Sequence, residues 1–270
     1  MGIGFIDLSL INPWVGALLI IATVSISVYI QLISNKWFSS EDFEKMLNVG
    51  GIYMSAVGTL YSVVLGMLLV NASGDFSDAR RSVEQESNSL MKLYYLSKGM
   101  PERYQPDISS SITEYVDHVL RFEWEKMPTK EIKFSTRSLI ENIWNAIRKI
   151  EPENENQKAV YPYLIQAHGE AFDNRITRLE YSNFTITEIE WFCLISGGIA
   201  VIIFTIFFYV KHKIAHAIMT GIVAFMVSSN LYAVYMLSNP FNGFMHMPKE
   251  RFEYLLDLVK KDGVQTVEKL

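Results

Sequence analysis

The sequence contains one cysteine in 270 residues, and the familiar catalytic patterns are missing from it. Cys193 has no second cysteine to pair with, so the chain forms no internal disulfide. It has no H-E-x-x-H, P-loop, G-x-S-x-G or zinc-spaced Cys–His pattern. The net charge is −5, and no basic patch is large enough to neutralise a phosphate backbone. These absences argue against an enzyme, a bound metal or cofactor, and a nucleic-acid-binding protein.

Half of the chain is hydrophobic, and four long apolar stretches contain no Asp, Glu, Lys or Arg. The mean hydropathy of +0.15 is high for a soluble protein but low for a chain made of membrane spans alone. Each stretch is long enough to cross a bilayer, which needs about 20 apolar residues. We therefore predict an all-α membrane protein with four transmembrane helices and a helical soluble domain inserted between spans two and three. The predicted spans are residues 14–34, 50–71, 191–210 and 215–237.

Other segments precede, connect and follow these spans. Residues 1–13 have no basic region, so we interpret the first span as a retained helix and not a signal peptide. Residues 35–49 form an interfacial connector, with a short amphipathic helix expected from Ser39 or Ser40. Residues 72–190 form the predicted soluble domain, and residues 238–270 an amphipathic C-terminal helix and tail.

The soluble domain shows helical periodicity and no convincing strand. We predict helices over about 75–98, 107–127, 135–150 and 157–181, with Asp107 and Ser135 as N-caps of the second and third. The residues expected to be buried on those two helices are Ile112, Tyr115, Val119 and Phe122, then Leu139, Ile143, Ile147 and Ile150.

Two stripes follow the second predicted span. Gly58, Ser62 and Gly66 recur every fourth residue and form a face narrow enough for close helix contact. The adjacent stripe, at the same spacing, includes Thr59, Val63 and Met67. Both an ordinary packed helix and a pore or oligomer interface agree with this pattern, so both interpretations stay open.

Four carboxylates follow this span directly: Asp75, Asp78, Glu84 and Glu86. In a symmetric oligomer they would ring the mouth of a pore, attracting cations and repelling anions. Alternatively Asp75 and Asp78 are solvated, or pair with Arg80 and Arg81 in neighbouring turns. The sequence does not distinguish these two interpretations.

Other candidates for chemistry have simpler explanations. His212 and His216 are four residues apart, but the lysines beside them disfavour a metal site. His168 is expected on the surface or in the core of a soluble helix. Glu123 and Glu125 are a candidate catalytic pair, although a solvated helix end explains them more simply.

A set of short motifs is spread over nearly the whole chain. They are Gly58-Thr59-Leu60-Tyr61, Leu65-Gly66, Ala79-Arg80, Val83-Glu84 with Glu86, Tyr115, Glu123-Trp124, Arg175 with Arg178, and Pro240-Phe241 with Gly243. Together these motifs resemble the bestrophin-like family of bacterial and plant membrane proteins, which is distantly similar to bestrophin channels.

The resemblance implies a homo-oligomer, by analogy a pentamer, that lies in a lipid bilayer and conducts inorganic ions through a pore lined by the second span. Ser62–Met67 looks like the bestrophin neck segment, and the match places Thr59, Val63 and Met67 at the constriction. The basic, aromatic segment after the neck of bestrophins is here Asp75–Arg80, which favours cations over anions. No acidic cluster matches the calcium clasp of animal bestrophins.

The leading hypothesis is therefore an oligomeric, bestrophin-like ion channel that leans toward cations. The alternative is a membrane-tethered helical sensor or scaffold without transport activity, because the soluble helices are long enough for a four-helix bundle. The distribution of Lys and Arg leans toward a bacterial inner-membrane protein with its termini and soluble domain in the cytoplasm.

Overall fold

The structure is a computed structural model that describes residues 12–37, 40–127, 137–183, 186–207, 212–241, 247 and 249–267. Every regular element within these ranges is a helix, and four of the helices are long and apolar enough to span a membrane. The predicted all-α, four-span fold class is thus confirmed. The chain divides into two compact units, Met1–Phe76 with Thr185–Asn239 and Ser77–Phe184 with Pro240–Leu270.

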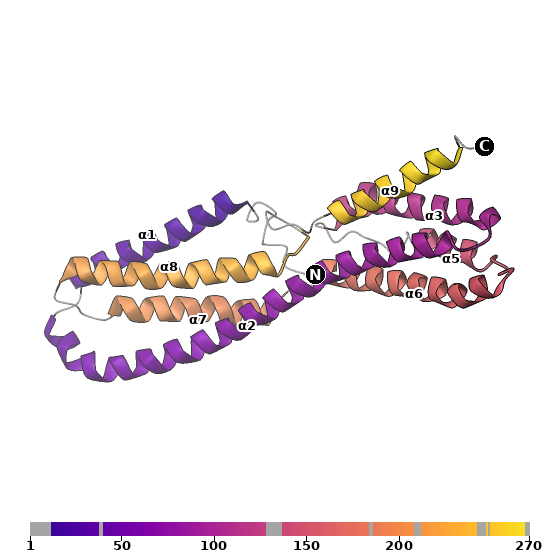
Figure 1. The fold of residues 1–270 in the computed structure, drawn as a ribbon. Helices are drawn as coiled ribbons and strands as arrows, with labels where there is room; N and C mark the ends of the chain where they lie inside the picture. Colours follow the sequence, from indigo (N-terminus) through magenta and orange to yellow (C-terminus); the bar gives the residue numbers. More distant parts are fainter. Residues whose placement is uncertain are drawn as a thin grey trace. The chain divides into compact units, whose positions relative to one another are not determined.

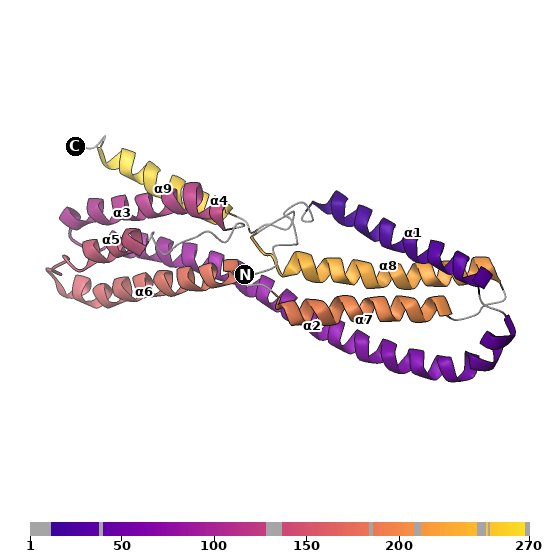
Figure 2. The same ribbon diagram turned by 180° about the vertical axis from the view of Figure 1, so that it is seen from behind.

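The first unit contains the four candidate spans (Figures 1 and 2). They are α1 (Pro13–Trp37), the N-terminal part of α2 (Ser40–Ser97), α7 (Glu188–Phe207) and α8 (Lys213–Leu237). Helix α8 packs against both α1 and α7. Leu65, Leu194 and Val234 form a buried cluster that joins α2, α7 and α8.

Helix α2 is a single helix of 58 residues. The sequence predicts a separate surface helix beginning at Ser39 or Ser40, but residues from Ser40 onward belong to α2 itself. No proline occurs between Ser40 and Ser97, so nothing in the backbone chemistry forces the helix to end at the membrane surface. It ends before Gly99-Met100-Pro101, where the Gly99 amide donates to the Leu96 carbonyl at 3.1 Å.

Two glycines of α7 allow close contact between spans. A Cβ atom at Gly197 would lie 2.5 Å from Cδ2 of Tyr61 on α2. A Cβ atom at Gly198 would lie 2.8 Å from Cγ1 of Val227 on α8. Only glycine fits at these distances, and such close approach is how membrane helices gain van der Waals contact without a hydrophobic driving force.

The second unit begins with the rest of α2 and adds the remaining helices (Figure 1). These are the 3-10 turn η2 (Glu102–Tyr104), α3 (Gln105–His118), the π-helical turn η3 (Val119–Glu123), α4 (Trp124–Lys126), α5 (Arg137–Ile147), α6 (Glu155–Asn183) and α9 (Glu250–Val267). Ser135, the predicted cap of α5, lies outside the described residues.

The predicted start of α3 at Asp107 is wrong. Pro106 lies in its first turn, a position that proline favours, and α3 begins at Gln105. The Gln105 side-chain amide donates to the carbonyls of Met100 at 2.9 Å and Lys98 at 3.2 Å, which ties the helix start to the preceding turn.

Two predicted core positions are also corrected. On α5 the predicted Ile143 and Ile147 are buried, but Ile140 is buried in place of Leu139, which is only half-buried. Phe122 is 53% exposed, whereas Glu123 beside it is buried. Glu123 continues the spacing of the buried residues Val116 and Val119, and Phe122 lies to the side of that face.

We expect Gly197→Ala to lower the stability of the membrane unit by about 1–3 kcal/mol, since the new methyl group overlaps the Tyr61 ring. Gly169→Ala, on α6, is the control, because a Cβ atom there meets nothing within 4 Å. Thermal unfolding of both variants, followed by circular dichroism in detergent, measures the difference. Equal midpoints for the two variants would contradict the close Tyr61–Gly197 contact.

Candidate functional site

The predicted neck residues lie on the face of α2 that no other described helix of the chain covers. Val63 is 54% exposed and Met67 is 64% exposed, and Thr59 is exposed one turn before them. Leu65 and Ala72, on the opposite face, are buried at 8% and 2% exposure. The stripe of α2 predicted to line a pore is therefore free within the protomer.

The glycines of the spans divide into two groups. At Gly16, Gly197, Gly198 and Gly221 an added Cβ atom would contact a neighbouring helix. At Gly51, Gly58, Gly66 and Gly74, all on α2, it would meet nothing within 4 Å. Ser62 is exposed, and its hydroxyl donates to the Thr59 carbonyl at 2.9 Å. The small-residue face of α2 thus makes no close contact within the protomer, and its predicted packing role stays a prediction for contact between copies.

The four predicted mouth carboxylates do not act as one group. Arg81 donates to Asp78 at 3.0 Å, so the alternative of pairing in a neighbouring turn is correct for Asp78. Arg80 donates to Glu84 at 3.3 Å, a pair that the sequence analysis did not predict. Asp75 is half-buried. The prediction is wrong for Glu86, whose side chain is fully buried in an ionic cluster.

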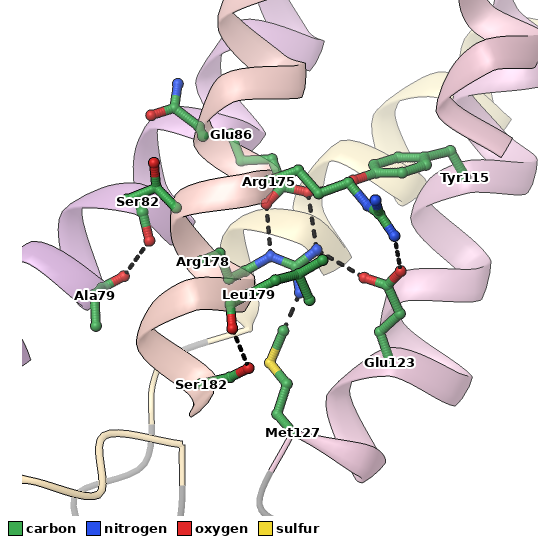
Figure 3. Close-up of polar contacts among 12 residues, drawn as sticks. Ala79, Ser82, Glu86, Tyr115, Glu123, Met127, Arg175, Arg178, Leu179 and Ser182 are labelled. Atoms are coloured by element: carbon green, nitrogen blue, oxygen red, sulfur yellow. Dashed lines mark hydrogen bonds and ion pairs between the residues drawn. The ribbon is translucent and has the colours of Figure 1, made fainter. Parts of the chain in front are cut away.

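This cluster consists of Glu86 on α2, Glu123 on η3, and Arg175 and Arg178 on α6 (Figure 3). The Arg178 guanidinium donates to both oxygens of Glu86, from Nε to Oε2 at 2.6 Å and from Nη2 to Oε1 at 3.1 Å. Arg178 Nη2 also donates to Glu123 Oε2 at 2.8 Å. Arg175 Nη2 donates to Glu123 Oε1 at 2.5 Å.

Neighbouring side chains complete the cluster. The Tyr115 hydroxyl on α3 donates to Glu86 Oε1 at 2.5 Å. Arg178 lies 6.0 Å from the ring centroid of Phe252 on α9, within the range of a cation–π contact. Trp124 makes edge contacts with the rings of Phe252 and Phe241 at 5.9 and 6.1 Å between centroids. The cluster thereby connects α2, α3, η3, α6 and α9.

The electrostatics of the cluster favour its charged form. Two carboxylates face two guanidiniums, so the buried group is neutral overall. Burial by itself raises the pKa of Glu123, but Arg178 and Arg175 outweigh this effect and lower it to about 2. Burial likewise opposes the charge on Arg178, while Glu86 and Glu123 hold its pKa well above the usual value. Because Glu123 stays ionised at neutral pH and is occupied by two arginines, the geometry fits a structural ion pair and not a general acid or base.

The sequence motifs include most residues of the ionic cluster, but they do not show that these residues contact one another. Glu86, Tyr115, Glu123, Arg175 and Arg178 come from four helical elements and converge in one cluster. Trp124 and Phe241 lie against each other, and Pro240 is buried, whereas Arg80 is exposed on the surface of α2. Arg175 and Arg178 are three residues apart on a helix, and this spacing was the signal that both face one partner.

The histidines make ordinary hydrogen bonds. His216 is buried between Gln31 Nε2 and the Thr205 carbonyl, each at 2.9 Å from a ring nitrogen, whereas His212 is exposed. His168 contacts the Ile140 carbonyl at 3.1 Å; burial lowers its pKa, and this hydrogen bond opposes the shift. Glu125 is exposed. Over the described part of the chain, no three His, Cys, Asp or Glu residues lie close enough together to hold a metal ion.

Four candidate spans with an attached helical unit define a multi-pass, all-α membrane protein. The chain belongs to the Bestrophin-like family, because the family model described as Bestrophin-like domain matches residues 21–252. No match is found among curated proteins.

Solved structures share this fold at low sequence identity. One mutant of a bacterial Bestrophin homolog from Klebsiella pneumoniae is 15% identical, with a TM-score of 0.70 over 89% of this chain and 99% of that chain. A second mutant of the same homolog is 14% identical, with a TM-score of 0.69 over 90% of this chain and 96% of that chain. The family and the fold predicted from the sequence are both confirmed.

We expect Glu86→Gln to destabilise the protein by about 3 kcal/mol or more, because it removes one charge from a buried, paired cluster. Glu84→Gln, two residues away, removes an exposed ion pair and should change the stability by less than about 1 kcal/mol. Chemical denaturation of the purified protein measures both. Similar shifts for the two variants would show that the cluster is not buried as described.

Proposed function

We propose that this protein is an oligomeric ion channel whose pore is lined by α2. Membership of the Bestrophin-like family and the shared fold support a channel-type function. The observation that carries the proposal is one face of α2. Its stripe of Thr59, Val63 and Met67 is exposed in the protomer, and a Cβ atom at Gly58 or Gly66 would meet nothing within 4 Å. Symmetric copies, a pentamer by family resemblance, would bring these stripes together around an axis.

The gate we propose is hydrophobic. Val63 and Met67 are apolar residues one helical turn apart, and a ring of such side chains can exclude water from a narrow pore. Ions cannot pass a dewetted segment, because they would lose their hydration shell without replacement. Thr59, with its hydroxyl group, is the most polar of the three proposed neck residues.

The proposed selectivity rests on Asp75 and Asp78, the first two carboxylates after the apolar part of α2. Repeated by symmetry, they would concentrate cations at one end of the pore. Glu86 is no longer part of this argument, because its side chain is fully buried with Arg178. Asp78 is kept because its ion pair with Arg81 is exposed at the surface. We place the protein in a bacterial inner membrane with the second unit in the cytoplasm, in line with the distribution of Lys and Arg.

Val63→Ala and Met67→Ala should each raise the ion flux by about twofold or more, because a smaller side chain widens and wets the neck. The flux is measured with purified protein in liposomes under separate potassium, sodium and chloride gradients. Leu18→Ala, at an exposed position of α1, is the control and should leave the flux unchanged.

Unchanged flux in both neck variants, in protein shown to be assembled, would remove Val63 and Met67 from the gate. No flux of any ion through a folded oligomer would instead favour the scaffold function, with the stripe of α2 serving only for packing.

Asp75→Asn combined with Asp78→Asn should lower the ratio of potassium to chloride permeability, because both changes remove negative charge from the proposed mouth. Reversal potentials in a potassium chloride gradient measure this ratio. Glu125→Gln is the control for a loss of charge elsewhere, since Glu125 is an exposed residue of α4. An unaltered reversal potential in the double variant would place these carboxylates away from the ion path.

A further inference from the structure

The membrane unit contains a cavity of about 330 Å³ between α1, α7 and α8. Its walls are mostly apolar and include Leu19 and Ile20 of α1, Ile195 and Ile199 of α7, and Leu231 of α8. A water molecule, which is close to a methylene group in size, takes about 30 Å³ of liquid volume, so the cavity has room for roughly ten methylene groups. This is the lower end of the size range of ligand pockets.

The hydroxyl groups in the wall do not make the cavity polar. The Thr23 hydroxyl donates to the Leu19 carbonyl at 2.9 Å, and the Ser228 hydroxyl donates to the Ala224 carbonyl at 2.7 Å. Both are thus bonded to their own helix, as is usual for Ser and Thr in membrane helices. The cavity is open at the surface of the membrane unit, and water would find few hydrogen-bond partners along its walls. An apolar occupant therefore fits it best.

The cavity runs along the spans and not across them. Gly16, Trp191 and Tyr235 lie in it close to the ends of their helices, and Thr23 and Ile202 lie further along. From Trp191 to Ile202 the rise is about 16 Å along α7. One leaflet contributes half of a hydrocarbon core that is about 30 Å thick, or about 15 Å. The length and direction of the cavity therefore match one acyl chain of one leaflet.

The end of the cavity nearest the helix termini suits the upper part of a lipid. Trp191 and Tyr235 are aromatic residues of the kind enriched at the membrane–water interface. The Tyr232 ring lies over Gly16, where any Cβ atom would overlap it. These aromatic side chains suit the level of the lipid headgroups and ester bonds.

We propose that this cavity binds one acyl chain of a phospholipid from the leaflet at the N-terminal end of α1. The bound acyl chain fills the space bounded by α1, α7 and α8 and stabilises the packing of these three helices through dispersion contacts. The site requires only that these helices span the membrane, so it does not depend on ion conduction. The competing occupant is an apolar side chain from a second copy of this protein, and the experiment distinguishes the two.

Ser228 and Ser229 provide a matched pair of variants. Both are on α8 and both hydroxyls donate to their own helix, but only Ser228 lines the cavity. The full chain is reconstituted in palmitoyl-oleoyl phosphatidylglycerol vesicles, extracted in mild detergent, and analysed by native mass spectrometry. We expect about one phospholipid per protomer in the wild type and in Ser229→Phe, and a several-fold lower occupancy in Ser228→Phe, whose ring fills the cavity.

A second pair covers the case in which Ser228→Phe fails to fold. Ile199→Trp changes an exposed cavity residue, and Ile203→Trp changes an exposed residue one turn further along α7 that is not in the wall. Lower lipid occupancy in Ile199→Trp alone supports the site. Equal occupancy in both members of each pair, or no retained lipid in the wild type, would overturn it. Unchanged lipid with loss of the oligomer in Ser228→Phe would assign the cavity to a second copy of the chain.

Discussion

The second unit depends on the contact between Arg178 and Glu86. A planar guanidinium that donates to both oxygens of a carboxylate fixes distance and orientation together, which a single hydrogen bond does not. The pair is fully buried, so neither residue can be lost without leaving a charge in a medium of low dielectric constant. The ion pair therefore fixes how far α2 and α6 are shifted along each other and how each is rotated about its axis. Around the pair, Tyr115 donates to Glu86, and Glu123 accepts from Arg178 and Arg175.

The π turn Val119–Glu123 supplies the second carboxylate of this arrangement. Glu123 follows the buried residues Val116 and Val119 by seven and four positions, so it lies on the same face of the helix. There it accepts from both arginines, while Phe122 stacks on His118 at the surface. A π turn is less stable than a regular α-helical turn. Here the hydrogen bonds that the buried Glu123 carboxylate accepts from two arginines offset that loss of stability.

Whether a feature of the structure could be predicted from the sequence depends on how far apart in the chain the interacting residues are. The spans could be predicted because length and apolar character are local properties of a segment. The pair Arg81–Asp78 was visible in its spacing for the same reason. Glu86 was misassigned because its partner is 92 residues away, and nothing next to it in the sequence distinguishes a buried carboxylate from a solvated one. The motifs identified the members of the cluster, but only the fold shows that they form one site.

The membrane unit has a different kind of constraint. Lipid tails are as apolar as leucine, so spans associate through close packing and not through the hydrophobic effect, and glycine is valuable where backbones approach. The glycines of α1, α7 and α8 named above serve such contacts inside the protomer, whereas those of α2 remain uncovered. A glycine that faces fluid lipid makes few dispersion contacts, because it has no side chain. The same glycine makes more of them when the backbone of a second helix packs closely against it. In the oligomer proposed above, another copy of α2 would cover these glycines, as a central pore lined by α2 requires.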